Sequence, residues 1–171
     1  MAEELKLPET GERGELYAAL QPQIATLIES EDDLVANLAN TAAVLHTALQ
    51  TLWTGFYRVK SDALVLGPFQ GPLACTRIPL VPEPRGVCGA AFKRREAVIV
   101  PDVEAFPGHI ACSSLSRSEI VVPLLVHGRV ELVLDIDSSE LDDFDEADLT
   151  GLGAVVGLLR ARHWPDHVVH E

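Results

Sequence analysis

The stretch EIVVPLLVHGRVELVLDID, residues 119–137, is the most informative about the fold of this 171-residue chain. Two segments rich in valine, leucine and isoleucine are joined there through His127-Gly128, and each has the length of a β-strand. Two strands with so short a connection predict an antiparallel hairpin. We therefore expect a sheet with this hairpin as one of its parts.

Earlier segments carry the same strand signals. WTGFYRV (53–59) and ALVLGPF (63–69) are aromatic and β-branched, and the step through residues 60–62 between them is a plausible second hairpin. AVIVPDV (97–103) predicts a further strand, and GVCGAAFKRRE (86–96) predicts a short helix before it. The centre of the chain is thus predicted to be rich in strands.

Two helices are predicted before these strands. The first should span residues 16–28, with Pro22 interrupting it near its start. The second has an N-cap candidate in Ser30, with Asp33 three residues on, and an apolar stripe at helical spacing that ends near Thr51.

A last helix is predicted after the strands. It should start in DFDEADL (143–149), where Asp143 and Glu146 have capping-box spacing, and end before Pro165. Helices first, strands in the centre and a helix last indicate an α+β fold: a central antiparallel sheet flanked by helices from both chain ends, with the helices on one face.

The chain length fits a single domain with one substantial core. We expect residues 1–15 to form a flexible N-terminal lead-in because they are polar and broken by proline and glycine. Residues 16–165 are expected to form the domain, and residues 166–171 a C-terminal tail.

Charge and composition exclude several classes of partner. A net charge of −13 and an isoelectric point near 4.7 repel phosphate backbones, so we expect no nucleic-acid or anionic-membrane partner. The N-terminus lacks the basic start and apolar run of a secretory signal, which favours a cytoplasmic location. The three cysteines are an odd number for a disulfide framework, so chemistry, metal binding or packing must explain them.

One cysteine lies in an unusual context. The segment PGHIACSSLSRS (107–118) sets Cys112 between a Pro-Gly-His turn and a run of serines. Packing cysteines usually lie inside apolar runs, whereas the residues after Cys112 are polar. The pattern favours a thiol that is presented rather than buried.

Other polar and aromatic residues allow two interpretations. Asp135 and Asp137 are one residue apart in a strand, so their side chains share one face, either toward water or in a binding site. By default Glu119 is a solvated strand end and Trp53 a core residue. A functional interpretation requires that these residues converge on Cys112.

Taken together, the motifs of the chain resemble the free methionine-R-sulfoxide reductases, a family with the GAF fold. The similar region covers roughly residues 50–150, and the flanking helices have the expected order. The loop LVPEP (80–84) is a few residues longer than is usual in that family. The blocks that carry the resemblance are WTGFYRV, LVLGPFQGPLACTRIP, RGVCGAA, VPDVEAFPGHIACSS, SRSEIVVPL, LDIDS and FDEAD.

The resemblance implies a thiol-dependent enzyme of oxidative stress that reduces free L-methionine-R-sulfoxide. By matching motif, Cys112 of FPGHIAC is the nucleophile, Cys75 of PLACTRIP the main resolving thiol, and Cys88 of RGVCG a third thiol that can join the recycling. A thiolate that attacks the sulfoxide becomes a sulfenic acid, which a second thiol closes to a redox-active disulfide. A thioredoxin-like protein would reduce that disulfide, so no bound cofactor is expected.

The resemblance also implies a substrate pocket. Trp53 and Tyr57 match the aromatic wall, while Glu119, Asp135 and Asp137 match the acidic contacts. Crowded carboxylates raise the pKa of one another, which suits Glu119 and Asp137 to hold the sulfoxide oxygen and supply its proton. Asp135 suits the substrate ammonium, because a buried charge needs an opposite partner.

The remaining ends of the substrate need other groups. No arginine beyond Arg117 is an obvious partner for its carboxylate, so we expect backbone N–H groups of Ile110, Ala111 and Cys112 to form an anion-binding nest. The indole of Trp53 should pack on the S-methyl group.

Two alternatives remain. The chain could be a GAF sensor module that binds a small ligand without turning it over. Cys75, Cys88, His109 and Cys112 have the ligand types of a zinc site, but no CxxC pair occurs, so we expect no metal. The sequence leaves the oligomeric state open, with a homodimer as one alternative.

Overall fold

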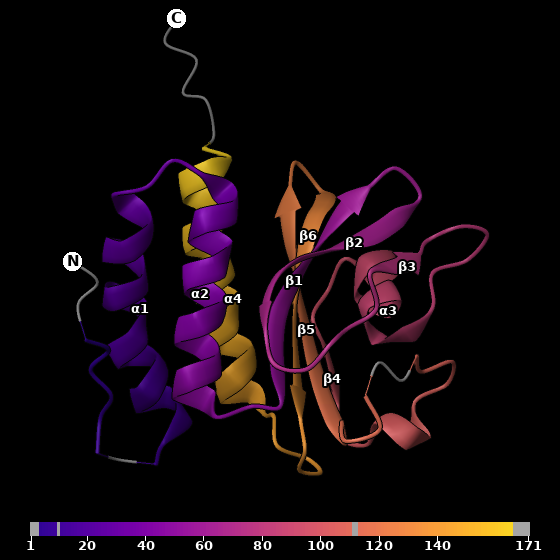
Figure 1. Cartoon of the computed structure of the whole chain (residues 1–171), viewed down its shortest axis with the longest axis horizontal. Helices are drawn as coiled ribbons and strands as arrows, with labels where there is room; N and C mark the ends of the chain where they lie inside the picture. Colours follow the sequence, from indigo (N-terminus) through magenta and orange to yellow (C-terminus); the bar gives the residue numbers. More distant parts are fainter. Residues whose placement is uncertain (1–3, 10, 111–112, 166–171) are drawn as a thin grey trace, which may run out of the picture.

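An antiparallel sheet forms the centre of the structure, a computed structural model that describes residues 4–9, 11–110 and 113–165 (Figure 1). The elements in chain order are α1 (Arg13–Glu29), α2 (Leu34–Leu49), β1 (Trp53–Lys60), β2 (Ala63–Gln70), β3 (Arg77–Pro79), α3 (Gly86–Arg94), β4 (Val98–Val100), the short 3-10 helix η1 (Val103–Ala105), β5 (Ser118–Val126), β6 (Arg129–Ser138) and α4 (Glu146–His163).

The strands are arranged in the order β3-β2-β1-β6-β5-β4, and every neighbouring pair is antiparallel. The sequence predicted all of them except β3, which has only three residues and takes its register from β2. In the described part of the chain, no helix is long and apolar enough to cross a membrane.

The β5–β6 hairpin confirms the interpretation of residues 119–137. His127 and Gly128 both have positive φ angles, 49° and 76°, as a two-residue turn between twisted strands requires. Glu119 pairs with Asp137 across the two strands, and Val126 pairs with Arg129 next to the turn. The register fixes which side chains share a face of the sheet.

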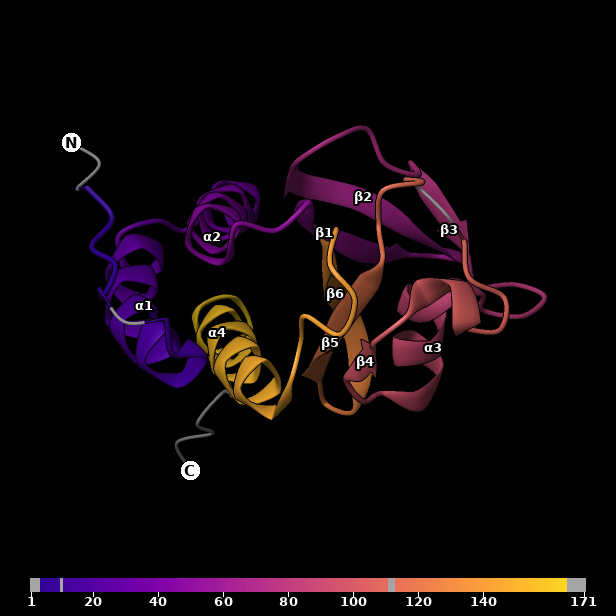
Figure 2. The same cartoon turned by 90° about the horizontal axis from the view of Figure 1, so that it is seen from below.

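Three long helices cover one face of the sheet and the short helix α3 covers the other (Figures 1 and 2). In Figure 2, α1 is outermost, and α2 and α4 lie between it and the sheet. Contacts of α2 with β1 and β2, and of α4 with β5, close this side, while α3 packs on β4, β5 and β6. The expectation that all helices lie on one face is therefore wrong for α3, because the central strands are apolar on both sides and the second side also needs a cover.

The N-terminal helices differ from the prediction in their bounds. Helix α1 begins at Arg13 rather than at Leu16 and continues through Pro22, because buried side chains before and after the proline pack against α4. Asp33, not Ser30, is the N-cap of α2, and Ser30 instead follows the last residue of α1.

The start of α4 corrects the predicted capping box. Asp145 and Asp148 form the box, not Asp143 and Glu146. The acidic run DFDEAD offers several pairs at this spacing, and the turn geometry selects one of them. Asp143 instead accepts a 2.8 Å hydrogen bond from Arg13 Nη2, which ties α1 to the chain entering α4.

Candidate functional site

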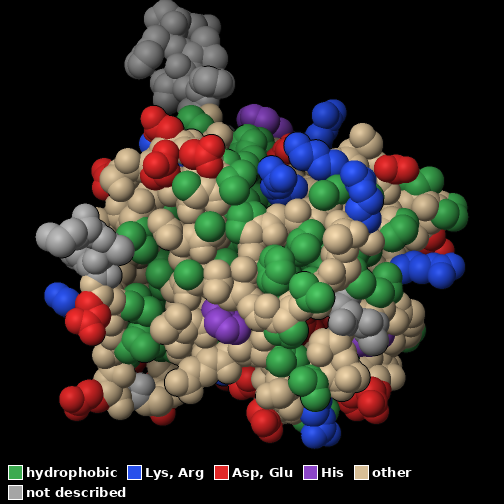
Figure 3. Space-filling view, in the orientation of Figure 1, with side chains coloured by type: hydrophobic (Ala, Val, Ile, Leu, Met, Phe, Trp, Pro, Cys, Tyr) green, Lys and Arg blue, Asp and Glu red, His purple; other side chains and the backbone are tan. Residues whose placement is uncertain are grey.

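A pocket lies on the side of the sheet that α3 covers. It has about 570 Å³ of empty volume, part of it open to solvent, and is lined by β1, β5, β6, the first turn of α3 and the loops between them. Leu73 at its mouth is 89% exposed. Figure 3 shows hydrophobic side chains across the middle of one face of the molecule, with many acidic side chains toward its edges.

Three carboxylates project into this pocket from the hairpin. Glu119 pairs directly with Asp137, and Asp135 stands two residues along β6 on the same face. Glu119 is only 5% exposed and Asp135 only 7%. Leu134 and Ile136 between and beside them face the helical layer. The β5–β6 hairpin is therefore covered on both faces of the sheet. Glu119 is not a solvated strand end, and the side chain of Asp135 does not face water.

The environment favours the protonated forms of these acids. Burial, followed by the charges of Asp135 and Asp137, raises the pKa of Glu119 well above its usual value. Burial and the charge of Asp137 also raise the pKa of Asp135. Burial raises the pKa of Asp137 to about 6, although a hydrogen bond from Ser116 opposes the shift. Carboxyl groups of this kind can donate a proton near neutral pH.

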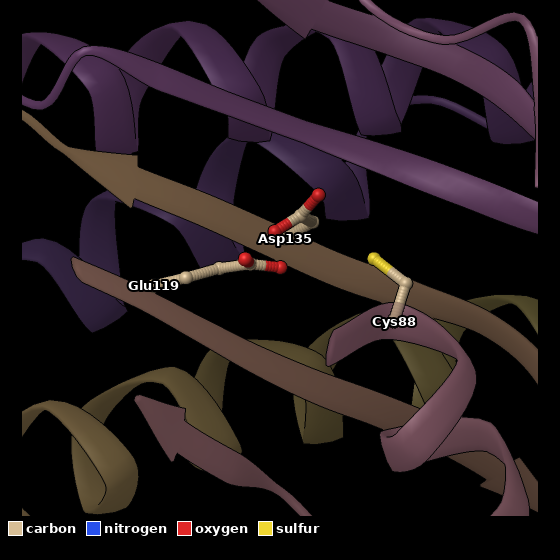
Figure 4. Close-up of side chains that lie close together, drawn as sticks. All are labelled: Cys88, Glu119 and Asp135. Atoms are coloured by element: carbon tan, nitrogen blue, oxygen red, sulfur yellow. The ribbon is translucent and has the colours of Figure 1, made fainter. Parts of the chain in front are cut away.

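Cys88 faces the same acids from the first turn of α3 (Figure 4). It is 3% exposed, and its Sγ and one oxygen each of Glu119 and Asp135 all lie within 4.8 Å of one another. Burial and the neighbouring carboxylates raise the pKa of the Cys88 thiol well above its usual value. A thiol kept protonated in this way is a poor first nucleophile, which agrees with the secondary role that the resemblance implies.

Cys75 lies between β2 and β3, half-buried and with a free thiol. Its backbone carbonyl accepts a 2.9 Å hydrogen bond from the hydroxyl of Tyr57, which lines the pocket. The long loop of residues 80–84 leads into α3, and Pro84 packs closely on Gly89, where an added Cβ would lie 2.9 Å from the Pro84 carbonyl carbon. This loop is therefore seated against the helix that carries Cys88.

An aromatic wall closes another side of the pocket. Trp53 is stacked between Tyr57 and Phe69, with ring centroids 5.9 Å and 5.4 Å away. Gly55 makes this stack possible, because an added Cβ would lie 2.5 Å from Trp53 Cη2. Trp53 is thus both a buried residue and a pocket residue.

Two buried polar atoms near this wall lack a hydrogen-bond partner within the described residues. They are Trp53 Nε1, a donor, and Asp135 Oδ1, an acceptor. Because an unpaired buried polar atom is costly, both atoms are suited to a polar ligand in the pocket.

The loop between η1 and β5 lies only partly within the structure. Ala111 and Cys112 are outside the described residues, so their predicted roles stay predictions. Their neighbours Ile110 and Ser113 both line the pocket. The chain thus meets the pocket immediately before and after the predicted nucleophile.

Three polar or charged pocket residues were given no pocket role from the sequence. Ser116 Oγ donates a 2.5 Å hydrogen bond to Asp137 Oδ1. His109, considered only as a zinc ligand, has its Nε2 3.8 Å from Glu119 Oε2. Arg85 lines the pocket, whereas Arg117, the arginine considered from the sequence, does not. Only the position of Arg85 next to the Gly86-Cys88 motif could have indicated it.

The zinc set that the sequence offered as an alternative, Cys75, Cys88, His109 and Cys112, includes one residue outside the described part of the chain, and the described residues form a different group. Cys88 is grouped with Glu119 and Asp135, and Cys75 is outside that group. Donors on three separate elements leave no short sequence spacing to detect.

Comparison with known proteins gives consistent matches. A family model described as GAF domain matches residues 29–161. The chain is 46% identical over 146 residues to the free methionine-R-sulfoxide reductase of Escherichia coli, covering 85% of this chain and 87% of that protein. It is 51% identical over 160 residues to GAF domain-containing protein A of Dictyostelium discoideum, covering 93% and 99%.

A solved structure gives the same family assignment as the sequence matches. The X-ray structure of free methionine-R-sulfoxide reductase from Neisseria meningitidis in complex with its substrate matches with a TM-score of 0.88 and 53% identity, over 94% of this chain and 96% of that chain. These matches, together with the acid-lined pocket of this chain, show that the chain belongs to the GAF domain family and, within it, to the free methionine-R-sulfoxide reductases.

Proposed function

We propose that the protein reduces free L-methionine-R-sulfoxide to L-methionine. The observation that carries the proposal is a group of three carboxylates facing the aromatic wall, with Glu119 and Asp135 buried and Asp137 partly buried, in a pocket that the chain lines on both sides of Cys112. The family relationship supports the same reaction. A free amino acid with a polar sulfoxide and a small apolar methyl group matches such a pocket.

The charged ends of the substrate have candidate partners. Asp135 would pair with the ammonium, which gives its unpaired Oδ1 a partner. Arg85 at the pocket wall and the backbone N–H groups of Ile110 to Cys112 would hold the carboxylate. Peptide-bound methionine sulfoxide offers neither charge, so the pocket would select the free amino acid.

The acids would also supply the proton that the reaction needs. The Cys112 thiolate attacks the sulfoxide sulfur, the oxygen passes to Cys112 as a sulfenic acid, and methionine leaves with its sulfur reduced by two electrons. Glu119 and Asp137, whose pKa values are raised, would protonate the oxygen as its bond to sulfur weakens. Trp53 would pack on the S-methyl group and fix the epimer.

A second thiol would complete the cycle. Cys75 would attack the sulfenic sulfur of Cys112, releasing water and forming a disulfide, with Cys88 as a further thiol in the relay. A dithiol protein of the thioredoxin type would reduce that disulfide by exchange. The exposed Leu73, two residues before Cys75, offers such a protein an apolar contact.

Single-turnover chemistry tests the proposal. Reduced wild-type protein mixed with the R-sulfoxide should yield methionine without added reductant, whereas Cys112→Ser should yield none, because serine is not a competent nucleophile without an activating base. The matched control, Cys75→Ser, should form one methionine per chain and then stall. Methionine is counted by chromatography.

The outcomes separate the alternatives. A Cys112→Ser protein that still forms methionine would exclude Cys112 as the nucleophile. A wild-type protein that binds the sulfoxide but leaves it unchanged, even with dithiothreitol, is the non-catalytic GAF module. Turnover of the S-sulfoxide in place of the R-sulfoxide would contradict the substrate assignment.

A further inference from the structure

The cysteine–acid group of the pocket has the make-up of a metal site. Cys88, Glu119 and Asp135 come from α3, β5 and β6, and Figure 4 shows the sulfur directed toward the two carboxylates. Their ligand atoms lie within 4.8 Å of one another. All three side chains are at least nine-tenths buried. Donors gathered from three rigid elements are held in place without a ligand.

A second observation points to a missing ligand. Asp135 Oδ1 is buried and has no hydrogen-bond partner among the described residues. A buried acceptor of this kind is expected to meet a cation or a donor when the pocket is filled. The pocket also gives a path from solvent, because Cys88, Glu119 and Asp135 all line it.

The donor types select the ion. One sulfur with carboxylate oxygens is unlike the all-oxygen sites of Ca²⁺ and Mg²⁺ and suits Zn²⁺, which accepts sulfur, nitrogen and oxygen. Tetrahedral zinc places sulfur and oxygen ligands about 3.5 Å apart, given bond lengths of about 2.3 and 2.1 Å. Because the ligand atoms lie within 4.8 Å of one another, their separations need to shorten by up to about 1.3 Å, and the ion would itself offset the repulsion between ionised carboxylates.

A fourth donor stands beside the group. His109 Nε2 lies 3.8 Å from Glu119 Oε2, and His109 lines the same pocket. Its ring nitrogens do not lie within 4.8 Å of all three ligand atoms of the group, so the His109 side chain would have to move toward the ion. Histidine nitrogen is a common zinc ligand and would then complete a tetrahedron of one sulfur, two oxygens and one nitrogen.

We propose that Cys88, Glu119, Asp135 and His109 form a zinc-binding site that overlaps the ammonium and oxygen subsites of the pocket, so that zinc and methionine sulfoxide exclude each other. The Cys88 thiol and the carboxyl groups of Glu119 and Asp135 release their protons to solvent as their sulfur and oxygen atoms bind the ion. Zinc bound at this site would therefore inhibit the reduction of methionine sulfoxide by the reduced protein. Mutual exclusion rests on the proposed function, whereas the binding of zinc does not.

Cobalt(II) substitution tests the ligand set directly. Reduced, metal-free protein titrated with Co²⁺ under argon should develop a sulfur-to-cobalt charge-transfer band that excess Zn²⁺ removes. The band should be absent in Cys88→Ser and in Cys88→Ala, with circular dichroism reporting whether each variant is folded. It should persist in the matched controls Cys75→Ser and Cys112→Ser. No band in the wild type, or a band that survives in a folded Cys88 variant, overturns the site.

Competition tests the overlap with substrate. Calorimetry on Cys112→Ser, in which turnover is blocked, should show zinc affinity falling about tenfold when the R-sulfoxide is present at about ten times its own Kd. L-Alanine at the same concentration controls for chelation of zinc by a free amino acid. Unchanged zinc affinity with bound sulfoxide overturns the mutual exclusion. A protein that shows the cobalt band but neither binds nor reduces the sulfoxide disproves the proposed function and leaves the zinc site supported.

Discussion

The two faces of the β5–β6 hairpin are both covered but differ in what they bury. Toward the long helices it presents Ile120, Leu134 and Ile136, which are fully enclosed by apolar neighbours. Toward α3 it presents the apolar Val121 and Val133 and, beside them, Glu119 and Asp135, whose carboxyl groups are buried against each other and against a thiol. The first face contributes stability by removing apolar surface from water. The buried acids of the second face oppose it, and such a cost is typical of a surface kept for function.

The largest expected effect concerns the substrate, because the acidic face and its opposite wall should recognise both charges of a free amino acid. Blocking L-methionine-R-sulfoxide as its N-acetyl, C-amide derivative removes two charge-assisted contacts of about 1.5 to 3 kcal/mol each. We therefore expect kcat/KM to fall by about a hundredfold or more. Turnover of both compounds at matched concentrations measures the ratio, and similar values would indicate a reductase of protein-bound methionine sulfoxide.

The next effect separates the two faces at adjacent residues. Asp135→Asn should lower kcat/KM by an amount equivalent to about 2 to 5 kcal/mol of transition-state free energy, as loss of one partner of a buried charge pair does. The free energy of unfolding should change little. Ile136→Val, on the helical face, should do the opposite: lose about 1 kcal/mol of stability and keep its kcat/KM. Urea unfolding and steady-state kinetics on both variants measure this contrast. A collapse of stability in Asp135→Asn with normal kinetics would make Asp135 a structural residue.

The difference between the faces also decided what the sequence could predict. The apolar run of residues 119–137 predicts the hairpin and the shared face of Asp135 and Asp137, because strand period is a local property. Whether that face is wet or buried depends on the packing of α3 from elsewhere in the chain. The family resemblance supplied the acids and aromatics of the pocket by motif. Ser116 could not be predicted, because a loop serine carries no pattern that identifies its partner.

A further prediction uses pH to expose the cost of the acidic face. Asp137 has a folded-state pKa of about 6, against its ordinary value of 3.8. The pKa of Asp137 is higher in the folded state than in the unfolded state. The contribution of protonated Asp137 to stability is therefore fully present below the unfolded-state pKa and is lost as pH rises through about 6. The loss amounts to up to about 3 kcal/mol at about 1.36 kcal/mol per pH unit.

Asp137→Asn isolates this contribution. Stability measured by urea unfolding should fall more steeply in the wild type than in the variant as pH rises through that window, because the amide has no proton to lose. Parallel curves for the two proteins would mean that Asp137 is solvated in the folded state, and the contrast between the two faces would then rest on Glu119 and Asp135 alone.

The smallest expected effect concerns the hydrogen bond that Ser116 donates to Asp137. This bond favours the ionised carboxylate and so holds the pKa of Asp137 below the value that burial alone would give. Ser116→Ala should raise that pKa further, by about one pH unit if the bond contributes about 1.5 kcal/mol. If Asp137 helps to protonate the sulfoxide oxygen, the alkaline limb of the kcat/KM profile should move to higher pH by the same amount.

Ser113→Ala is the matched control, since Ser113 also lines the pocket but its hydroxyl accepts a hydrogen bond from the backbone N–H of Leu115. A lower kcat with an unmoved limb would mean that Ser116 only shapes the loop, and the proton would then have to come from Glu119.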